Sequence, residues 1–105
     1  MKAVEELLGK KVIVRSFGAG VFYGTLAEAE NSNGNWTAEL RDCRRIWSWQ
    51  GACSLSQLSL EGTKKPQECK FSVMEYSVVV SGIVEFHGCS EEAVKSIESV
   101  GIWKV

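Results

Sequence analysis

The sequence has 105 residues, of which 45% are hydrophobic and 24% are charged, a composition typical of a single globular domain. Twelve basic and thirteen acidic residues give a formal net charge of −1, which argues against a protein that coats duplex nucleic acid, because such proteins are usually basic. No apolar run approaches the roughly 20 residues of a membrane-spanning helix, and the acidic residues near the N-terminus interrupt the apolar core that a signal peptide needs, so we expect no signal peptide. We therefore expect one soluble domain, residues 1–105, with no membrane contact.

The N-terminal part of the chain predicts a short helix and then a β-hairpin. Apolar residues have helical spacing over residues 2–9, and Gly9 ends that helix because glycine favours the backbone conformation found after a helix. The periodicity of residues 11–17 predicts a strand. A glycine-containing turn then returns the chain along a second strand, over residues 21–26.

The middle of the chain predicts a long third strand and a short helix. The Asn- and Gly-rich segment 31–35 is the strongest turn signal, since both residue types tolerate positive φ. A strand follows over residues 36–49, in one piece or in two pieces broken near Asp42. Leucine spacing in residues 51–62 indicates a short helix or a loop packed on the sheet, and Ser54 is placed to cap it.

The C-terminal part predicts two more strands and a final helix. Residues 71–86 are rich in Val, Ile, Tyr and Phe and predict two strands that meet at Ser81-Gly82. Ser90 caps the last helix, and Gly101 stops it. The predicted fold class is therefore α+β, a small antiparallel β-sheet or partly open barrel with a short N-terminal helix and a C-terminal helix.

The chemistry-bearing residues give no support for an enzyme. The cysteines are Cys43, Cys53, Cys69 and Cys89, no pair has the CxxC spacing, and without a secretion signal reduced thiols are favoured over disulfides. His87 and Cys89 are half of a zinc site only if distant cysteines supply the rest, so we expect no metal. No nucleophile stands beside a recognisable general base, so we expect neither catalysis nor a cofactor.

The most unusual segment is RRIWSWQGACSLSQ, residues 44–57. On a strand, side chains alternate between faces, so Arg45, Trp47 and Trp49 share one face and Arg44 lies on the other. Guanidinium and indole groups together suit a nucleotide, because indole stacks on a base and the arginine fork binds phosphate. Small and neutral polar residues downstream offer space and further contacts. The candidate ligand-binding residues of this segment are Arg44, Arg45, Trp47, Trp49, Gly51, Ala52, Ser54, Ser56 and Gln57.

A structural interpretation of the same residues remains open. The two tryptophans of the segment can belong to the core, and the two arginines can pair with surface acids. A second candidate site is the segment 15–20, where Arg15 precedes glycines whose N–H groups can form an anion-binding nest. Its alternative is a plain hairpin turn, because it lacks the spacing of a known phosphate-binding motif.

The central segment resembles a family of small phage and prophage proteins. Their pattern is approximately RRIWxWxGAxxLSQLAxxGxxxPxxCKF, which residues 44–71 follow, except that Ser59 stands where Ala is expected. The hairpin sequence VRSFGAGVFYGTL, residues 14–26, is similar to the family's VRxxxxGVxFGTL. The resemblance covers about residues 10–105, and the segment 28–35 is longer than usual.

The nearest functional relatives that this family resembles are the Thoeris anti-defence sponges of phages. Those proteins capture glycocyclic ADP-ribose without cleaving it, and some also hold cyclic oligonucleotides of CBASS defence. They assemble as hexamers built from dimers. The resemblance implies that this chain is a non-enzymatic sponge for a cyclic nucleotide, acting as a homo-oligomer in the cytoplasm of the bacterial host, with pockets between protomers.

Sequestration of a scarce signal requires nanomolar affinity, roughly −12 kcal/mol. In this interpretation Arg44 or Arg45 holds phosphate and Trp47 or Trp49 stacks on a base. Further phosphate contacts are expected from Arg15 and Lys70. Two alternatives remain: a protein–protein interaction module that inhibits a host factor, and a small single-stranded nucleic-acid-binding protein, against which the near-neutral charge counts.

Overall fold

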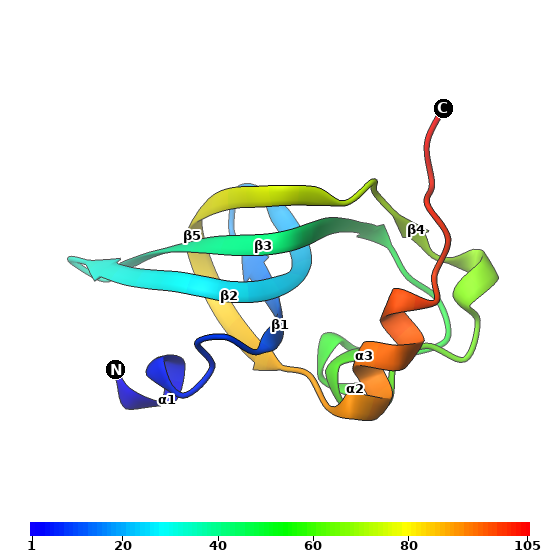
Figure 1. The fold of residues 1–105 in the computed structure, drawn as a ribbon, viewed down its shortest axis with the longest axis horizontal. Coiled ribbons are helices and arrows are strands. Elements are labelled where there is room, and N and C mark those ends of the chain that lie inside the picture. The colour runs from blue at the N-terminus through cyan, green and yellow to red at the C-terminus, as the bar shows by residue number, and fades with distance from the viewer.

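Antiparallel pairing joins four strands of the protein into a ring in the computed structural model, which describes residues 1–105 (Figure 1). In chain order the elements are α1 (Lys2–Glu5), β1 (Lys11–Ser16), β2 (Gly20–Ser32), β3 (Asn35–Ser48), α2 (Leu55–Glu61), the 3₁₀ helix η1 (Pro66–Glu68), β4 (Lys70–Phe71), β5 (Glu75–Gly88) and α3 (Glu91–Glu98). The pairing order is β2-β1-β5-β3-β4, and an additional pairing of β2 with β3 closes the ring. The arrangement is ring-like without being a regular barrel, and the predicted α+β class is confirmed.

β2 is longer than the predicted strand 21–26, and β3 and β5 are continuous where the sequence allowed or predicted a break. β3 runs unbroken through Asp42, whose φ of 49° accommodates an extra residue opposite β2. β5 also continues through Gly82, at φ 68°, so the prediction of two strands meeting there is wrong. A residue with positive φ makes a β-bulge that bends a strand without ending it. The bend lets β5 pair with β3 along its first half and with β1 along its second half.

The helices follow their predicted caps, but α1 is shorter than predicted. The Ser54 hydroxyl accepts a hydrogen bond from the Gln57 amide at the start of α2, and Ser90 does the same for Ala93 at the start of α3. Both caps confirm the sequence prediction. α1 ends at Glu5 and gives way to turns.

The core consists of two clusters on opposite sides of the strands. Alternate residues of β1 belong to different clusters. Val12 and Val14 face the interior of the ring, whereas Ile13 faces α2 and α3. Figure 1 shows α2 and α3 side by side on one side of the sheet. The second cluster contains Ile13, Tyr23, Ile46, Leu55, Leu58, Cys69, Phe71, Ala93, Ile97 and Val100. It therefore fixes the end of β3, β4 and both helices as one unit. None of the helices has the length and apolar character needed to cross a membrane.

Candidate functional site

The end of β3 directs its two adjacent arginines to opposite faces. Arg44 is only 4% exposed, whereas Arg45 is exposed. The predicted alternation is confirmed for Arg44, Arg45 and Trp47. Trp49 departs from it, because β3 ends at Ser48 and the chain turns there.

Arg44 binds backbone carbonyls instead of a ligand. Its guanidinium donates to the carbonyl oxygens of Ser72 at 2.9 Å, Val100 at 2.8 Å and Gly101 at 2.9 Å, and it contacts that of Phe71 at 3.4 Å. Burial lowers the pKa of this guanidinium from its ordinary value. No acid pairs with it, so the surface-pairing interpretation is wrong for Arg44, and so is its expected role as an exposed phosphate clamp. It joins β4 to the chain that follows α3.

Arg45 remains the accessible arginine of the pair. Its guanidinium lies 4.4 Å from the centroid of the Phe22 ring and donates to the Ala19 carbonyl. It forms no ion pair with an acid, in contrast to Arg15 and Arg41, which pair with glutamates. Arg45 therefore keeps an uncompensated positive charge on the face that it shares with Trp47.

A pair of stacked tryptophans lies next to this face. The rings of Trp47 and Trp103 are 11° from parallel, and their centroids are 6.4 Å apart. Both are exposed, Trp47 by 65% and Trp103 by 45%. The ammonium nitrogen of Lys70 lies 5.3 Å from the centroid of the Trp103 ring, without an acidic partner. We call Arg45, Trp47, Lys70 and Trp103 the aromatic–cationic surface.

Trp103 is the functional candidate that sequence reasoning did not select. Its amide donates to the Phe71 carbonyl at 2.9 Å, and its neighbour Ile102 forms a parallel bridge with Phe71. Arg44 holds the chain immediately before it through the carbonyls of Val100 and Gly101. The available signal was an aromatic residue directly after a predicted helix.

Three other residues predicted to contact a ligand, Trp49, Gly51 and Ala52, instead stabilise the turn after β3. Trp49 Nε1 donates to the Ala52 carbonyl at 3.1 Å, and both residues pack on the second core cluster. Gly51 has a φ of 83°, and a Cβ atom there would lie 2.5 Å from the Lys65 amide nitrogen. The expectation that Gly51 and Ala52 leave space for a ligand is therefore wrong, because the chain at residues 63–65 fills that space.

The polar residues at the start of α2 also bond within the chain. Ser54 caps the helix, and Gln57 Oε1 accepts from the Cys53 amide at 2.8 Å. The Ser56 carbonyl accepts from Ser59 Oγ at 3.0 Å. The side chains of Ser54 and Gln57 therefore stabilise the start of α2. Of these three polar residues, only Ser56 has an exposed side chain that forms no hydrogen bond.

Arg15 is held by an ion-pair cluster on β1 and β5. Its Nε and Nη2 both lie 2.6 Å from Glu85 Oε2, and His87 Nε2 lies 2.7 Å from Glu85 Oε1. The hydrogen bond from His87, and to a lesser extent the one from Arg15, holds the pKa of Glu85 below its ordinary value of 4.5. The expected nest beside Arg15 is a hairpin turn, in which the amides of Phe17 and Ala19 already have acceptors.

The remaining reactive groups are free cysteines that belong to no metal-binding cluster. All four cysteines are free, and burial raises the pKa of the Cys43 and Cys89 thiols to about 12. No three His, Cys, Asp or Glu side chains come together as metal ligands. Cys53 is the exposed cysteine, and nothing in the structure places a base beside it.

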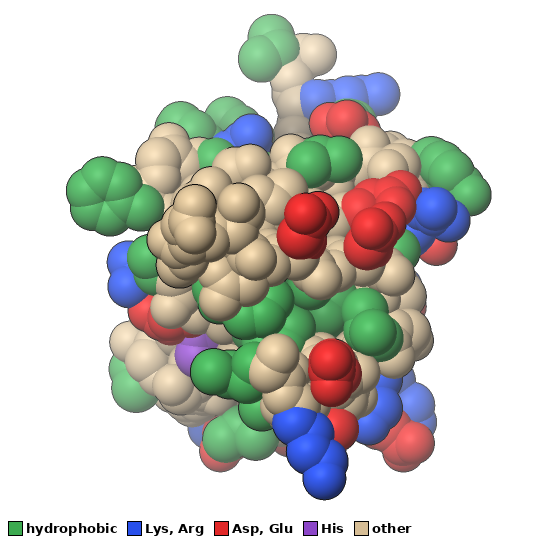
Figure 2. All heavy atoms as spheres, turned by 90° about the vertical axis from the view of Figure 1, so that its left-hand side faces the viewer, with side chains coloured by type: hydrophobic (Ala, Val, Ile, Leu, Met, Phe, Trp, Pro, Cys, Tyr) green, Lys and Arg blue, Asp and Glu red, His purple; other side chains and the backbone are tan.

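Three depressions mark the surface of the chain, with volumes of about 140, 200 and 220 Å³. The first lies between α1 and the hairpin of β2 and β3, where Figure 2 shows apolar side chains. The third adjoins the aromatic–cationic surface and is lined by Gly101, Ile102 and Trp103 among others. All are smaller than the roughly 300–1,000 Å³ of typical ligand pockets. None of the three depressions is therefore large enough to enclose a nucleotide.

The chain is a small α+β domain with a ring-like antiparallel sheet and an exposed aromatic–cationic surface. The family model described as a domain of unknown function, DUF6948, matches residues 9–97, and the chain belongs to that family. The comparisons with curated proteins and with solved structures give no significant match.

Proposed function

We propose that this protein is a non-enzymatic sponge that binds a cyclic nucleotide signal on the aromatic–cationic surface. The ligand class comes from the resemblance of residues 44–71 to phage proteins that resemble Thoeris anti-defence sponges. The ligand would be glycocyclic ADP-ribose or a CBASS cyclic oligonucleotide, captured in the cytoplasm of a bacterial host.

The observation that carries the proposal is the exposed, nearly parallel pair Trp47 and Trp103, with the unpaired cation Lys70 beside it. A second unpaired cation, Arg45, lies two residues before Trp47 on the same strand. Each indole is partly exposed to water, so a planar base can stack on it. Such a stack contributes roughly 1–3 kcal/mol to the free energy of binding. Lys70 and Arg45 are not neutralised by acids, so each can meet a phosphate. Aromatic planes and cations on one surface match the two chemical parts of a nucleotide.

A second copy of the chain is part of this proposal. The largest depression of one protomer, about 220 Å³, adjoins Trp103 and is too small and open to bury a cyclic nucleotide. Nanomolar affinity requires roughly −12 kcal/mol, more than two stacks provide. A facing protomer would double the aromatic and cationic groups around one ligand.

The test is calorimetric titration of the full chain with glycocyclic ADP-ribose and, separately, with cyclic di- and trinucleotides. We expect nanomolar binding of at least one ligand, and chromatography after heat denaturation should recover that ligand unchanged. Trp47→Ala and Trp103→Ala should each weaken binding by about 5-fold to 150-fold, the equivalent of one lost stack.

Phe17→Ala is the matched control, because Phe17 is an exposed aromatic residue that belongs to neither core cluster. Its affinity should equal that of the wild type. The proposal is contradicted if the protein binds none of the ligands, or if Trp47→Ala and Trp103→Ala bind as tightly as Phe17→Ala. Recovery of a cleaved ligand would indicate an enzyme instead.

A protein partner is the second candidate, favoured by the apolar residues that adjoin the surface. Ile102 is 58% exposed next to Trp103, and Met74 is exposed between β4 and β5. Exposed Trp and Arg residues dominate the binding energy of many protein interfaces. If no nucleotide binds, pull-down from host lysate with wild type and Trp103→Ala as baits should identify a partner lost in the variant.

A further inference from the structure

The first half of β5 has one free edge. Residues 75–83 pair with β3 on one side, whereas β1 joins the other side only from the middle of the strand onward. Ser16 Oγ donates to the Ser81 carbonyl at 2.7 Å, so the open edge ends there. Figure 1 shows this part of β5 along the upper margin of the molecule, and no other strand pairs with it.

Backbone alternation identifies the groups that are open on this edge. The Ser81 carbonyl points away from β3, toward Ser16. In a strand, residues two apart direct their N–H and C=O groups to the same side. The backbone groups of Val79, Ser77 and, by the same alternation, Glu75 therefore also point away from β3. The segment 75–79 presents donors and acceptors that have no partner strand.

The side chains along this edge are apolar and exposed. Tyr76 is 72% exposed and Val79 is 67% exposed, and Val73 and Met74 just before them are exposed as well. Glu75 is the one charged residue between positions 72 and 81, which contain no lysine and no proline. Natural edge strands are usually protected from pairing by lysine, proline or a bulge. An edge without such protection is a surface for strand addition.

We propose that residues 75–79 of β5 pair antiparallel with the same residues of a second copy, about a two-fold axis at Ser77. In this register the backbone of Tyr76 in one copy lies opposite that of Val78 in the other, and the outward N–H and C=O groups of residues 75, 77 and 79 meet their counterparts. Glu75 lies opposite Val79, so no like charges face each other. The segment is therefore complementary to itself, as an isologous two-fold interface requires.

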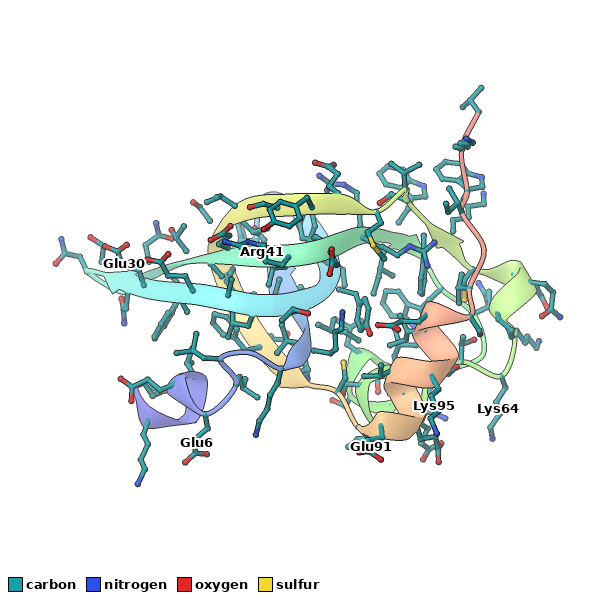
Figure 3. All side chains as sticks on the ribbon, in the orientation of Figure 1. Glu6, Glu30, Arg41, Lys64, Glu91 and Lys95 are labelled. Carbon is teal, nitrogen blue, oxygen red and sulfur yellow. The ribbon has the colours of Figure 1, made fainter.

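The outer face of the sheet is compatible with this pairing. Arg41, which Figure 3 labels on β3, donates to Glu39 and to the Tyr76 hydroxyl. Ser77 Oγ also donates to Glu39. The charges next to the edge are thus compensated within each protomer. The dimer does not depend on the aromatic–cationic surface, and failure to bind nucleotides would leave it unaffected.

Hydrogen exchange of the wild type tests the pairing directly. The amides of Ser77 and Val79 should be protected in concentrated protein and should lose that protection after about a hundredfold dilution, because dissociation follows mass action. The amides of Val78 and Val80, which point toward β3, are the internal control and should remain protected throughout. Rapid exchange of Ser77 and Val79 at every concentration overturns the proposal.

Light scattering with two variants tests the assembly. The wild type should have at least twice the chain mass of 11.6 kDa. Val79→Pro removes an outward N–H, and proline is tolerated where an edge N–H faces solvent, so this variant should fold and have half the wild-type mass or less. Val79→Thr retains the N–H and the β-branched shape and should assemble like the wild type.

Three results contradict the two-fold pairing: a monomeric wild type, aggregates of no fixed size, or a folded Val79→Pro variant that keeps the wild-type mass. Circular dichroism establishes whether Val79→Pro is folded. If that variant does not fold, the exchange of Ser77 and Val79 in the wild type still gives the answer.

Discussion

Arg44 and Arg45 are neighbours in sequence and have opposite surroundings because β-strand side chains alternate. The buried Arg44 is compensated by carbonyl oxygens of two chain segments, residues 71–72 and 100–101, and no carboxylate takes part. A planar guanidinium suits this arrangement, because its donors diverge in one plane toward several acceptors. Arg44 thus sets the path of the chain before Trp103, and Arg45 is left for external contacts.

Arg44→Met should lower the free energy of unfolding by about 2–4 kcal/mol, because several buried carbonyls lose their donor at once. Arg45→Met is the matched control and should cost less than about 1 kcal/mol, since it removes an exposed cation–π contact and one hydrogen bond. Urea unfolding of both variants measures the difference. Equal costs would show that the Arg44 contacts do not stabilise the fold.

At the scale of elements, residues 44–57 form one compact strand–turn–helix unit. Gly51 is the tightest point of the turn, since its missing Cβ makes room for the amides of Lys64 and Lys65. Trp49 closes the turn from one side and the Ser54 cap begins α2 on the other. The unusual sequence of this segment is explained largely by its own folding, and the aromatic–cationic surface uses only two of its residues.

Gly51→Ala should destabilise the protein by about 2–5 kcal/mol, because it combines strain at positive φ with overpacking against backbone. Gly34 has nearly the same φ, 84°, in the open turn between β2 and β3, and nothing lies near its missing Cβ. Gly34→Ala should therefore cost only about 1–2 kcal/mol, the strain alone. Thermal unfolding of both variants separates the two effects, and equal shifts would exclude overpacking at Gly51.

At the scale of the whole molecule, closure of the ring depends on β5 changing partners at Gly82. The bend brings its second half against β1, where Glu85 joins Arg15 and His87. The same bend leaves the first half without a partner on one side. Ring closure and the open edge are thus two consequences of one bulge.

The Glu85 cluster predicts a defined acid sensitivity. Its contacts depress the pKa of Glu85 in the folded state below the ordinary value of 4.5, so folding favours the ionised form. The stabilisation is fully present above that value and is lost as the pH falls through the folded pKa. Relative to Glu85→Gln, the wild type should be more stable at neutral pH, and this advantage should shrink in acid.

Unfolding by urea at a series of pH values measures this difference. Glu30→Gln is the control, because Glu30 lies near the end of the β2–β3 hairpin, where Figure 3 labels it, and forms no ion pair. Its stability should follow the wild type at every pH. A pH-independent difference between wild type and Glu85→Gln would exclude the cluster as the cause.

The fold class, the caps at Ser54 and Ser90 and the opposite faces of Arg44 and Arg45 were determined by the sequence itself. The caps and the opposite faces depend on residues within a few positions of one another, through strand alternation or hydrogen bonds in the first helical turn, and the fold class follows from the types of elements that such local patterns predict. Such local rules hold before any tertiary contact forms.

Only the tertiary structure decided which residues form the candidate surface. Trp103 meets Trp47 because Arg44 and β4 hold the end of the chain against β3, and Trp49 turns inward because β3 stops at Ser48. The open edge of β5 likewise arises from the bend at Gly82, where a single sequence signal fits both a turn and a bulge. Contacts between distant segments are set by the packing of the whole chain, which no local pattern specifies.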